Sequence, residues 1–316
     1  MEYLMIGIAL LCLTVKGYCG KRLSFFVEST ADTYLFNLLR MLFCLVIGIA
    51  LVFFEQAQGS LAINGGMLAI CALSGLSNAA FLVGWMLAIR KNAMVSVDVS
   101  LTLGSLIPSV LCLLLFSEPL SLPKMLGFAL IVVATVILAG HSKKTVGGGA
   151  VGALLLAFAT VGDGMTGFAQ QLYKQYYTEA GSKCVGITFP KTVFHFYTYV
   201  FAGVALLLFL VGYHILLRHK ADARARSKKK SPFAIAPRAL LHIAVMAVCL
   251  FAANYFQTVA TNDYGVSSQM LYPIIKGGCL ITVNFTAMIF FGERITPRSV
   301  CGSLVALVGI VCMSLL

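Results

Sequence analysis

Long apolar runs constrain the fold of this chain more than any other feature of its sequence. Near the C-terminus, Ser267–Phe291 and Arg298–Leu316 flank a short polar turn at Gly292–Glu293–Arg294. Each run approaches the roughly 20 residues with which an α-helix crosses the ~30 Å hydrocarbon core of a bilayer. Hydrophobic residues make up 60% of the chain and charged residues 11%, whereas soluble domains carry about 25% charged residues. We therefore expect an all-α polytopic membrane protein.

Ten such apolar segments can be placed along the sequence. A polar, glycine-rich linker at 141–149 separates the first five from the last five, so we expect one repeat at 1–140 and another at 150–316. Because five is an odd number, the halves must insert in opposite senses, which predicts ten transmembrane helices in two inverted five-helix repeats. The segments are Tyr3–Val15, Asp32–Phe54, Gly66–Ile89, Ala93–Phe116, Lys124–Gly140, Ala150–Leu172, Pro190–Leu217, Arg238–Ala260, Ser267–Phe291 and Arg298–Leu316.

A local sequence repeat supports this division. Glu118 matches Glu293 and Gly127 matches Gly302, both at an offset of 175 residues (293 − 118 and 302 − 127). In each copy a long helix is followed by a polar turn and then by a glycine-containing closing helix. An internal repeat of this kind constrains the architecture before any single residue is considered.

At these residues the chain resembles the ten-helix EamA-type members of the drug/metabolite transporter superfamily, whose five-helix halves each close with a Gly–Glu turn before the last helix. The second copy, FFGERITPRSVCGSLVALVGIVCM, is a close match. The first copy, FSEPLSLPKMLGFALIVVATVIL, carries Ser117 where the family prefers glycine. The resemblance implies a secondary transporter, with net export as the family-level expectation, and leaves the substrate open.

Lysines and arginines collect on one face of the expected bundle, above all in a basic loop at 218–231. The positive-inside rule places that face in the cytoplasm and both chain termini outside, although family members usually have both termini in the cytoplasm. We expect a multi-pass protein of the bacterial plasma membrane, with this loop near anionic lipid head groups. A basic run can also bind nucleic acid. This one lacks aromatic residues and lies between two membrane helices, so we expect no nucleic-acid partner.

Polar and ionisable side chains inside apolar segments are costly, and in membrane proteins they mark pathways and binding sites. Lys276 is the first candidate for substrate binding, because it follows Pro273 closely and precedes two glycines. The other candidates for substrate contact are Tyr272, Lys16, Asn78 and Trp85. A second set is assigned to proton coupling or to charge pairing that merely fastens helices together: Asp98, Asp163, His195 and Arg40.

Two prolines inside apolar segments, Pro273 and Pro108, are expected to break their helices. Proline removes a backbone donor and disrupts the hydrogen bond to the preceding turn. The freed carbonyls would either face substrate or pack against protein. Trp85 has an alternative role at the membrane–water interface, where tryptophan is enriched, and we extend the same alternative to His195 near its helix end.

We expect Lys16 and Lys276 in the cavity, and the first segment contains no acidic residue. The expected binding site therefore has a positive net charge. This favours secondary active transport of a small polar metabolite, anionic or zwitterionic, such as an amino acid or an organic acid. The alternative is a proton-coupled exporter of drugs or cations, in which Asp98 or Asp163 dominates the site. An intramembrane enzyme is a different class, and Asp98, Asp163 and His195 show no spacing typical of a catalytic constellation.

We expect no enzymatic activity, no cofactor and no metal. The ten cysteines include no CxxC pair, and buried cysteine behaves as a small apolar side chain. The sequence also has no GxxxxGK[ST] motif for nucleotide binding. The energy for transport would therefore come from a proton gradient or from exchange. The expected partners are the substrate, a coupling proton and the lipid bilayer, and the oligomeric state stays open.

Overall fold

The computed structural model describes residues 1–55, 61–91, 94–116, 121–142, 149–179, 181, 183–184, 186–221, 236–292 and 297–314. The linker predicted at 141–149 and the basic loop predicted at 218–231 lie largely outside these residues. Glu118 and Glu293, which carry the local repeat, also lie outside them.

Regular structure in the described part of the chain is α-helical, and most helices follow the predicted apolar segments within a few residues. The helices are α1 (Glu2–Ser24), α2 (Thr30–Phe54), α3 (Gly65–Lys91), α4 (Met94–Gly104), α5 (Leu106–Phe116), α6 (Leu122–Ser142), α7 (Gly149–Tyr177), α8 (Lys191–Ala221), α9 (Pro237–Asn262), α10 (Ser268–Phe291) and α11 (Pro297–Ser314).

Local sequence signals define several helix ends. At the start of α2, the Ser29 hydroxyl accepts a hydrogen bond from the Asp32 N–H, and the Asp32 carboxylate accepts one from the Ser29 N–H at 2.7 Å. This reciprocal capping box satisfies backbone donors that a helix start otherwise leaves free. α10 ends at Gly292, which adopts φ 63°. Only glycine takes this left-handed conformation without a steric penalty.

The helices are long and apolar enough to make this a multi-pass membrane protein. By length and composition, seven described helices could cross a membrane: α1, α2, α3, α7, α8, α9 and α10. Shorter apolar stretches occupy Ser100–Phe116, Met125–Ile137 and Val300–Cys312. The seven agree with predicted spans, and the other three predicted spans correspond to these shorter stretches.

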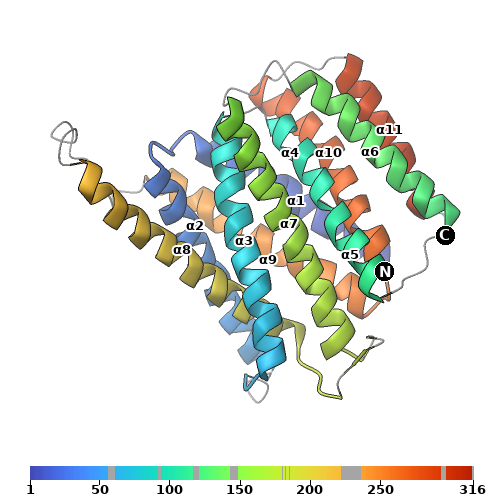
Figure 1. Cartoon of the computed structure of the whole chain (residues 1–316), viewed down its shortest axis with the longest axis horizontal. Helices are drawn as coiled ribbons and strands as arrows, with labels where there is room; N and C mark the ends of the chain where they lie inside the picture. Colours follow the sequence, from blue (N-terminus) through green and yellow to red (C-terminus); the bar gives the residue numbers. More distant parts are fainter. Residues whose placement is uncertain are drawn as a thin grey trace.

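The main contacts between helices join elements far apart in the sequence. α1 packs on α9 and α3 on α7, while α2 pairs with α8 and α6 with α11. In Figure 1, α6 and α11 form one edge of the bundle, and α2 and α8 form the opposite edge. The remaining helices lie between these two pairs, so the centre of the bundle is built from α1, α3, α4, α5, α7, α9 and α10.

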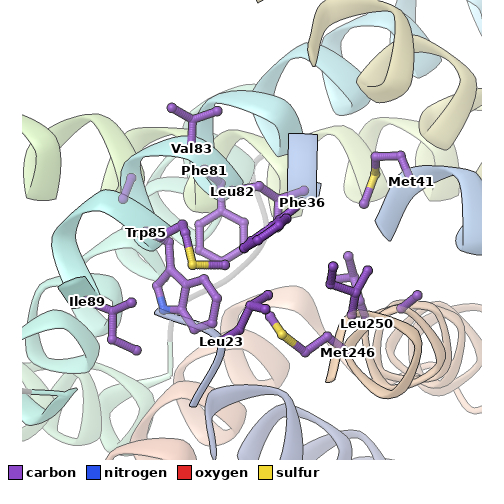
Figure 2. Packing of buried hydrophobic residues seen from close by; sticks show 14 of the residues in the cluster. Leu23, Phe36, Met41, Phe81, Leu82, Val83, Trp85, Ile89, Met246 and Leu250 are labelled. Carbon is purple, nitrogen blue, oxygen red and sulfur yellow. The ribbon is translucent and has the colours of Figure 1, made fainter. Parts of the chain in front are cut away.

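The largest apolar cluster lies where α1, α2, α3 and α9 meet (Figure 2). Trp85 of α3 is only 2% exposed and lies within this cluster, not on the surface of the bundle. A Cβ on Gly20 of α1 would lie 2.0 Å from the Trp85 ring, so the indole packs directly on the α1 backbone. This buried indole forms one wall of the site described below.

α1 is longer than the predicted Tyr3–Val15, which hydropathy alone ends before Lys16. In the structure Lys16 is 6% exposed, and its Nζ lies over the rings of Phe81 and Trp85 at 4.9 and 5.5 Å from their centroids. A cation over an aromatic face is attracted by the ring quadrupole. α1 therefore continues past the lysine to Ser24.

Proline has different effects in the two helices where a break was expected. The predicted segment Ala93–Phe116 is interrupted at Ser105, which separates α4 from α5. Pro108 then falls in the first turn of α5, where a missing N–H is tolerated. α10, by contrast, continues through Pro273, so the break predicted there is wrong. Pro273 removes one bond in the second turn, and packing of α10 on α1, α4, α5 and α11 holds the helix together.

Candidate functional site

A small polar cavity lies in the centre of the bundle. Its volume is about 30 Å³, which is room for about two water molecules. Its described lining comes from α1, α3, α5, α7, α9 and α10 and from the break between α4 and α5. The charged side chains among these lining residues are Lys16, Asp163 and Lys276.

Lys276 of α10 and Asp163 of α7 form an ion pair in this cavity. The Lys276 Nζ lies 2.6 Å from an Asp163 carboxylate oxygen, and the two side chains are 15% and 13% exposed. Removing both charges from water is costly, and their close contact offsets much of that cost. The structure thus brings together the first candidate for substrate binding and one of the two candidate acids.

The glycines on either side of Asp163 explain its position. A Cβ on Gly162 would lie 2.6 Å from the Phe81 backbone nitrogen, and one on Gly164 would lie 2.5 Å from the Gly104 carbonyl oxygen. Glycine at both positions therefore lets α7 approach α3 on one side and α4 on the other. The Gly–Asp–Gly sequence places a carboxylate where three helices meet.

A second cavity of about 20 Å³ adjoins the same two lysines. Lys16, Trp85, Asp98 and Lys276 are among the residues that line it. Lys276 also lies over the Phe81 ring, with its Nζ 6.0 Å from the centroid, so both ammonium groups lie close to this ring. Asp98, the second candidate acid, is engaged in interactions of its own.

Tyr272 and Asn78 also line the larger cavity. The Tyr272 hydroxyl donates to the Gln170 side-chain oxygen at 2.7 Å, with the Gly167 carbonyl at 3.0 Å, and accepts from the Gln171 amide at 3.4 Å. Tyr272 therefore ties α10 to α7 beside the ion pair. The Asn78 amide nitrogen is buried without a hydrogen-bond partner in the described structure, which leaves one donor without an acceptor at the cavity.

Two of the predicted ionisable residues, His195 and Arg40, are not among the described residues that line either cavity. His195 is 1% exposed, and its Nε2 lies 3.0 Å from the Thr258 hydroxyl oxygen. Aromatic rings of Phe194, Tyr199, Phe251 and Tyr255 surround it. His195 is therefore buried between α8 and α9 and, like Trp85, is not exposed at the surface of the bundle.

Arg40 is fully buried behind Trp85, with its guanidinium carbon 5.8 Å from the indole centroid. One terminal nitrogen donates to the Met246 sulfur at 3.6 Å, while Nε and the other terminal nitrogen lack hydrogen-bond partners. The Arg40 side chain therefore does not snorkel, since its charged group is buried in the protein. A buried cation with two unsatisfied donors is expensive.

We expect Arg40→Met to raise the melting temperature of the purified protein, because it removes a buried charge that has no acidic partner among the described ion pairs. Comparable replacements stabilise by about 1–4 kcal/mol. Leu39→Met, at the neighbouring position on α2, serves as the control. A melting temperature lowered by Arg40→Met would show that the guanidinium holds a favourable partner in the membrane.

Phe81 is a residue of the site that the sequence analysis did not single out. It lies four residues before Trp85 on α3, and residues at that spacing share one face of a helix. That spacing was the available signal, but an aromatic residue in an apolar helix looks like ordinary core. Pro108 also lines the larger cavity, whereas Pro273 is not among its described lining residues.

A wider cavity of about 460 Å³ opens near the ends of α2, α7 and α9 and the start of α8. Lys191 forms an ion pair with Asp263 across its rim. The Glu55 carboxylate accepts hydrogen bonds from Thr192 and Tyr255, both at 3.0 Å. These contacts join α2, α8 and the end of α9 at the face of the bundle that carries Met1.

Comparison with known proteins supports the fold and no more. No protein-family model matches the chain, and no curated protein sequence matches it. One crystal structure, described only as that of a protein, is similar over 99% of this chain and 96% of its own, with a TM-score of 0.67 and 14% sequence identity. The chain therefore shares its overall helical fold with a solved protein along nearly its entire length.

Proposed function

We propose that this chain is a secondary active transporter of a small polar metabolite, anionic or zwitterionic, such as an amino acid or an organic acid. One observation carries the proposal: the Lys276–Asp163 ion pair, with Lys16 beside it, lies in a cavity at the centre of the bundle. Ionisable groups at this depth are rare unless they serve a pathway or a substrate. On its sequence motifs we place the chain among the EamA-type drug/metabolite transporters.

The helix contacts support two halves, α1–α6 and α7–α11, related by an approximate two-fold axis. α1 packs on α9 as α7 packs on α3, and α2 packs on α9 as α8 packs on α3. α2 and α8 pair with each other, as do α6 and α11. Reciprocal pairs of this kind are what an inverted repeat produces. The cavity then lies between the halves, where alternating access requires it.

The size of the central cavity fits a closed conformation. Its volume of about 30 Å³ is too small for a whole metabolite, so the helices must separate for substrate to enter. We propose that the contacts around Lys191 and Glu55 close the face that carries Met1. On the charge rule this face is extracellular, which places both termini outside a bacterial plasma membrane, and we propose net export driven by protons or by exchange.

A proton-coupled exporter of cations is the second candidate. The observation that favours it is the presence of Asp163 and Asp98 at the two adjoining cavities. In that mechanism protonation of Asp163 would remove its negative charge and break the ion pair with Lys276, which would change the charge of the site. For an intramembrane enzyme, Asp163 is the only carboxylate among the described residues that line the larger cavity, and it is already held by Lys276.

A thermal-shift panel sorted by charge tests this proposal. Amino acids or organic acids should raise the melting temperature of the wild-type protein, since a ligand at 100 times its Kd contributes about 2.7 kcal/mol. Lys276→Gln should abolish that ligand-induced shift, because the cavity loses a cation. Arg238→Gln, which removes an exposed cation at the start of α9, is the matched control and should retain the ligand-induced shift. Stabilisation by cations alone would replace this proposal with the cation exporter.

A further inference from the structure

We infer that the substrate is a monocarboxylate whose carboxylate binds Lys16 and Asn78, an inference that rests on the proposed transport function. Both residues line the larger cavity. The two offer hydrogen-bond donors and come from different helices, α1 and α3. The zwitterionic class is thereby set aside in favour of a substrate with one net negative charge.

The carboxylate of Asp163 is already committed to Lys276 at 2.6 Å. Lys16 has no such partner: its described contacts are the faces of Phe81 and Trp85, which attract a cation without neutralising it. The Lys16 side chain lines both cavities while being only 6% exposed. A buried ammonium group beside an open space is a receptor for an anion.

An uncharged residue of the cavity lining, Asn78, also favours a carboxylate as the ligand. Among the buried side-chain atoms without a hydrogen-bond partner, the Asn78 amide nitrogen is the one that belongs to a residue lining the larger cavity. It is a donor and therefore needs an acceptor. A carboxylate has only acceptor atoms, and one of its oxygens can take the ammonium hydrogen while the other takes the amide hydrogen.

The charges around the site favour a single negative charge on the substrate. Three cations, Lys16, Arg40 and Lys276, surround Phe81 and Trp85. They face two acids, Asp98 and Asp163, at the cavities. Among these described side chains, one positive charge remains in excess. A monoanion neutralises the cluster, whereas an amino acid leaves it positive and its ammonium group finds both acids engaged.

The test uses the purified full-length protein and probes that differ mainly in charge. Lactate, alanine and alaninamide share a three-carbon skeleton and carry net charges of −1, 0 and +1 at neutral pH. Propionate and benzoate extend the monocarboxylates to other shapes. Melting temperature and equilibrium binding are measured for each probe, followed by exchange of radiolabelled probe in proteoliposomes.

We expect at least one monocarboxylate to bind, and lactate to bind more tightly than alanine, with no binding of alaninamide. Lys16→Gln should weaken monocarboxylate binding about 10- to 100-fold, the loss expected for a hydrogen bond to a charged group. Lys16→Arg should restore most of it. Arg238→Gln is the matched control, since it removes an exposed cation at the start of α9 that is not among the described lining of either cavity.

Several outcomes would overturn the inference. They are no binding of any of the three monocarboxylates, alanine bound as tightly as lactate, or unchanged lactate binding in Lys16→Gln. Exchange of alanine without exchange of lactate would leave a transporter of zwitterions and refute the monocarboxylate. Lactate binding that depends on Lys16, with no exchange of any probe across the membrane, would instead refute the transport function and keep the binding site.

Discussion

Asp163→Asn is expected to destabilise the protein strongly, because it leaves Lys276 charged and unpaired at a site where only about 15% of its side chain is exposed. Removing one partner of a buried ion pair typically costs about 3–5 kcal/mol. For a protein of this size, that loss lowers the melting temperature by roughly 6–15 °C. Differential scanning fluorimetry of the purified variant in detergent measures it.

Two further variants separate the charge effect from simple loss of packing. Asp163→Asn combined with Lys276→Met removes both charges, and stability should return to near the wild-type value. Asp263→Asn breaks the exposed pair with Lys191, whose side chains are 44% and 24% exposed, and should cost less than about 1 kcal/mol. A double variant as unstable as Asp163→Asn alone would show that packing, not the unpaired lysine, causes the loss.

Gly162→Ala is expected to have the second large effect, because the added methyl group meets backbone that cannot rotate away. A Cβ there would lie 2.6 Å from the Phe81 nitrogen and 2.7 Å from the Ser77 carbonyl oxygen of α3. α3 and α7 must separate to admit it, at a cost of about 1–3 kcal/mol or more. Separating the two helices also moves Asp163, so both the melting temperature and the transport rate should fall.

Gly212→Ala is the matched control for that substitution. Gly212 also lies inside a helix, α8, but nothing lies within 4 Å of the position a Cβ would occupy. Alanine should be neutral there or stabilise by up to about 1 kcal/mol through helix propensity. If Gly162→Ala proves as harmless as Gly212→Ala, the crossing of α3 and α7 is looser than the structure places it.

The helices themselves were predictable because backbone hydrogen bonding leaves few alternatives in an apolar environment. The predicted Ser267–Phe291 became α10 at Ser268–Phe291, and the predicted Asp32–Phe54 became α2 at Thr30–Phe54. The predicted end of the first segment at Val15 and the predicted break at Pro273 were both wrong. The cost of burying a charge opposes Lys16 and the missing N–H opposes Pro273, and contacts from other helices offset both costs.

The candidate site was predictable residue by residue but not as an arrangement. The cost of burying charge singled out Lys276, Lys16, Asp98 and Asp163 on hydropathy alone. The same argument singled out His195, which the structure buries elsewhere among aromatic rings. One-dimensional patterns record how deep a residue lies in the membrane and carry little information on which helix it faces.

The sequence by itself therefore determined the class of protein, the course of most helices and the set of residues whose burial in a membrane is costly enough to require an explanation. Only the tertiary structure decided that Asp163 pairs with Lys276 and that the ammonium groups of Lys16 and Lys276 both lie over the Phe81 ring. The physical reason is that hydropathy acts along each helix separately. Ion pairs and cation–ring contacts depend on how closely different helices approach one another, as Gly162 and Gly164 permit for α7 against α3 and α4.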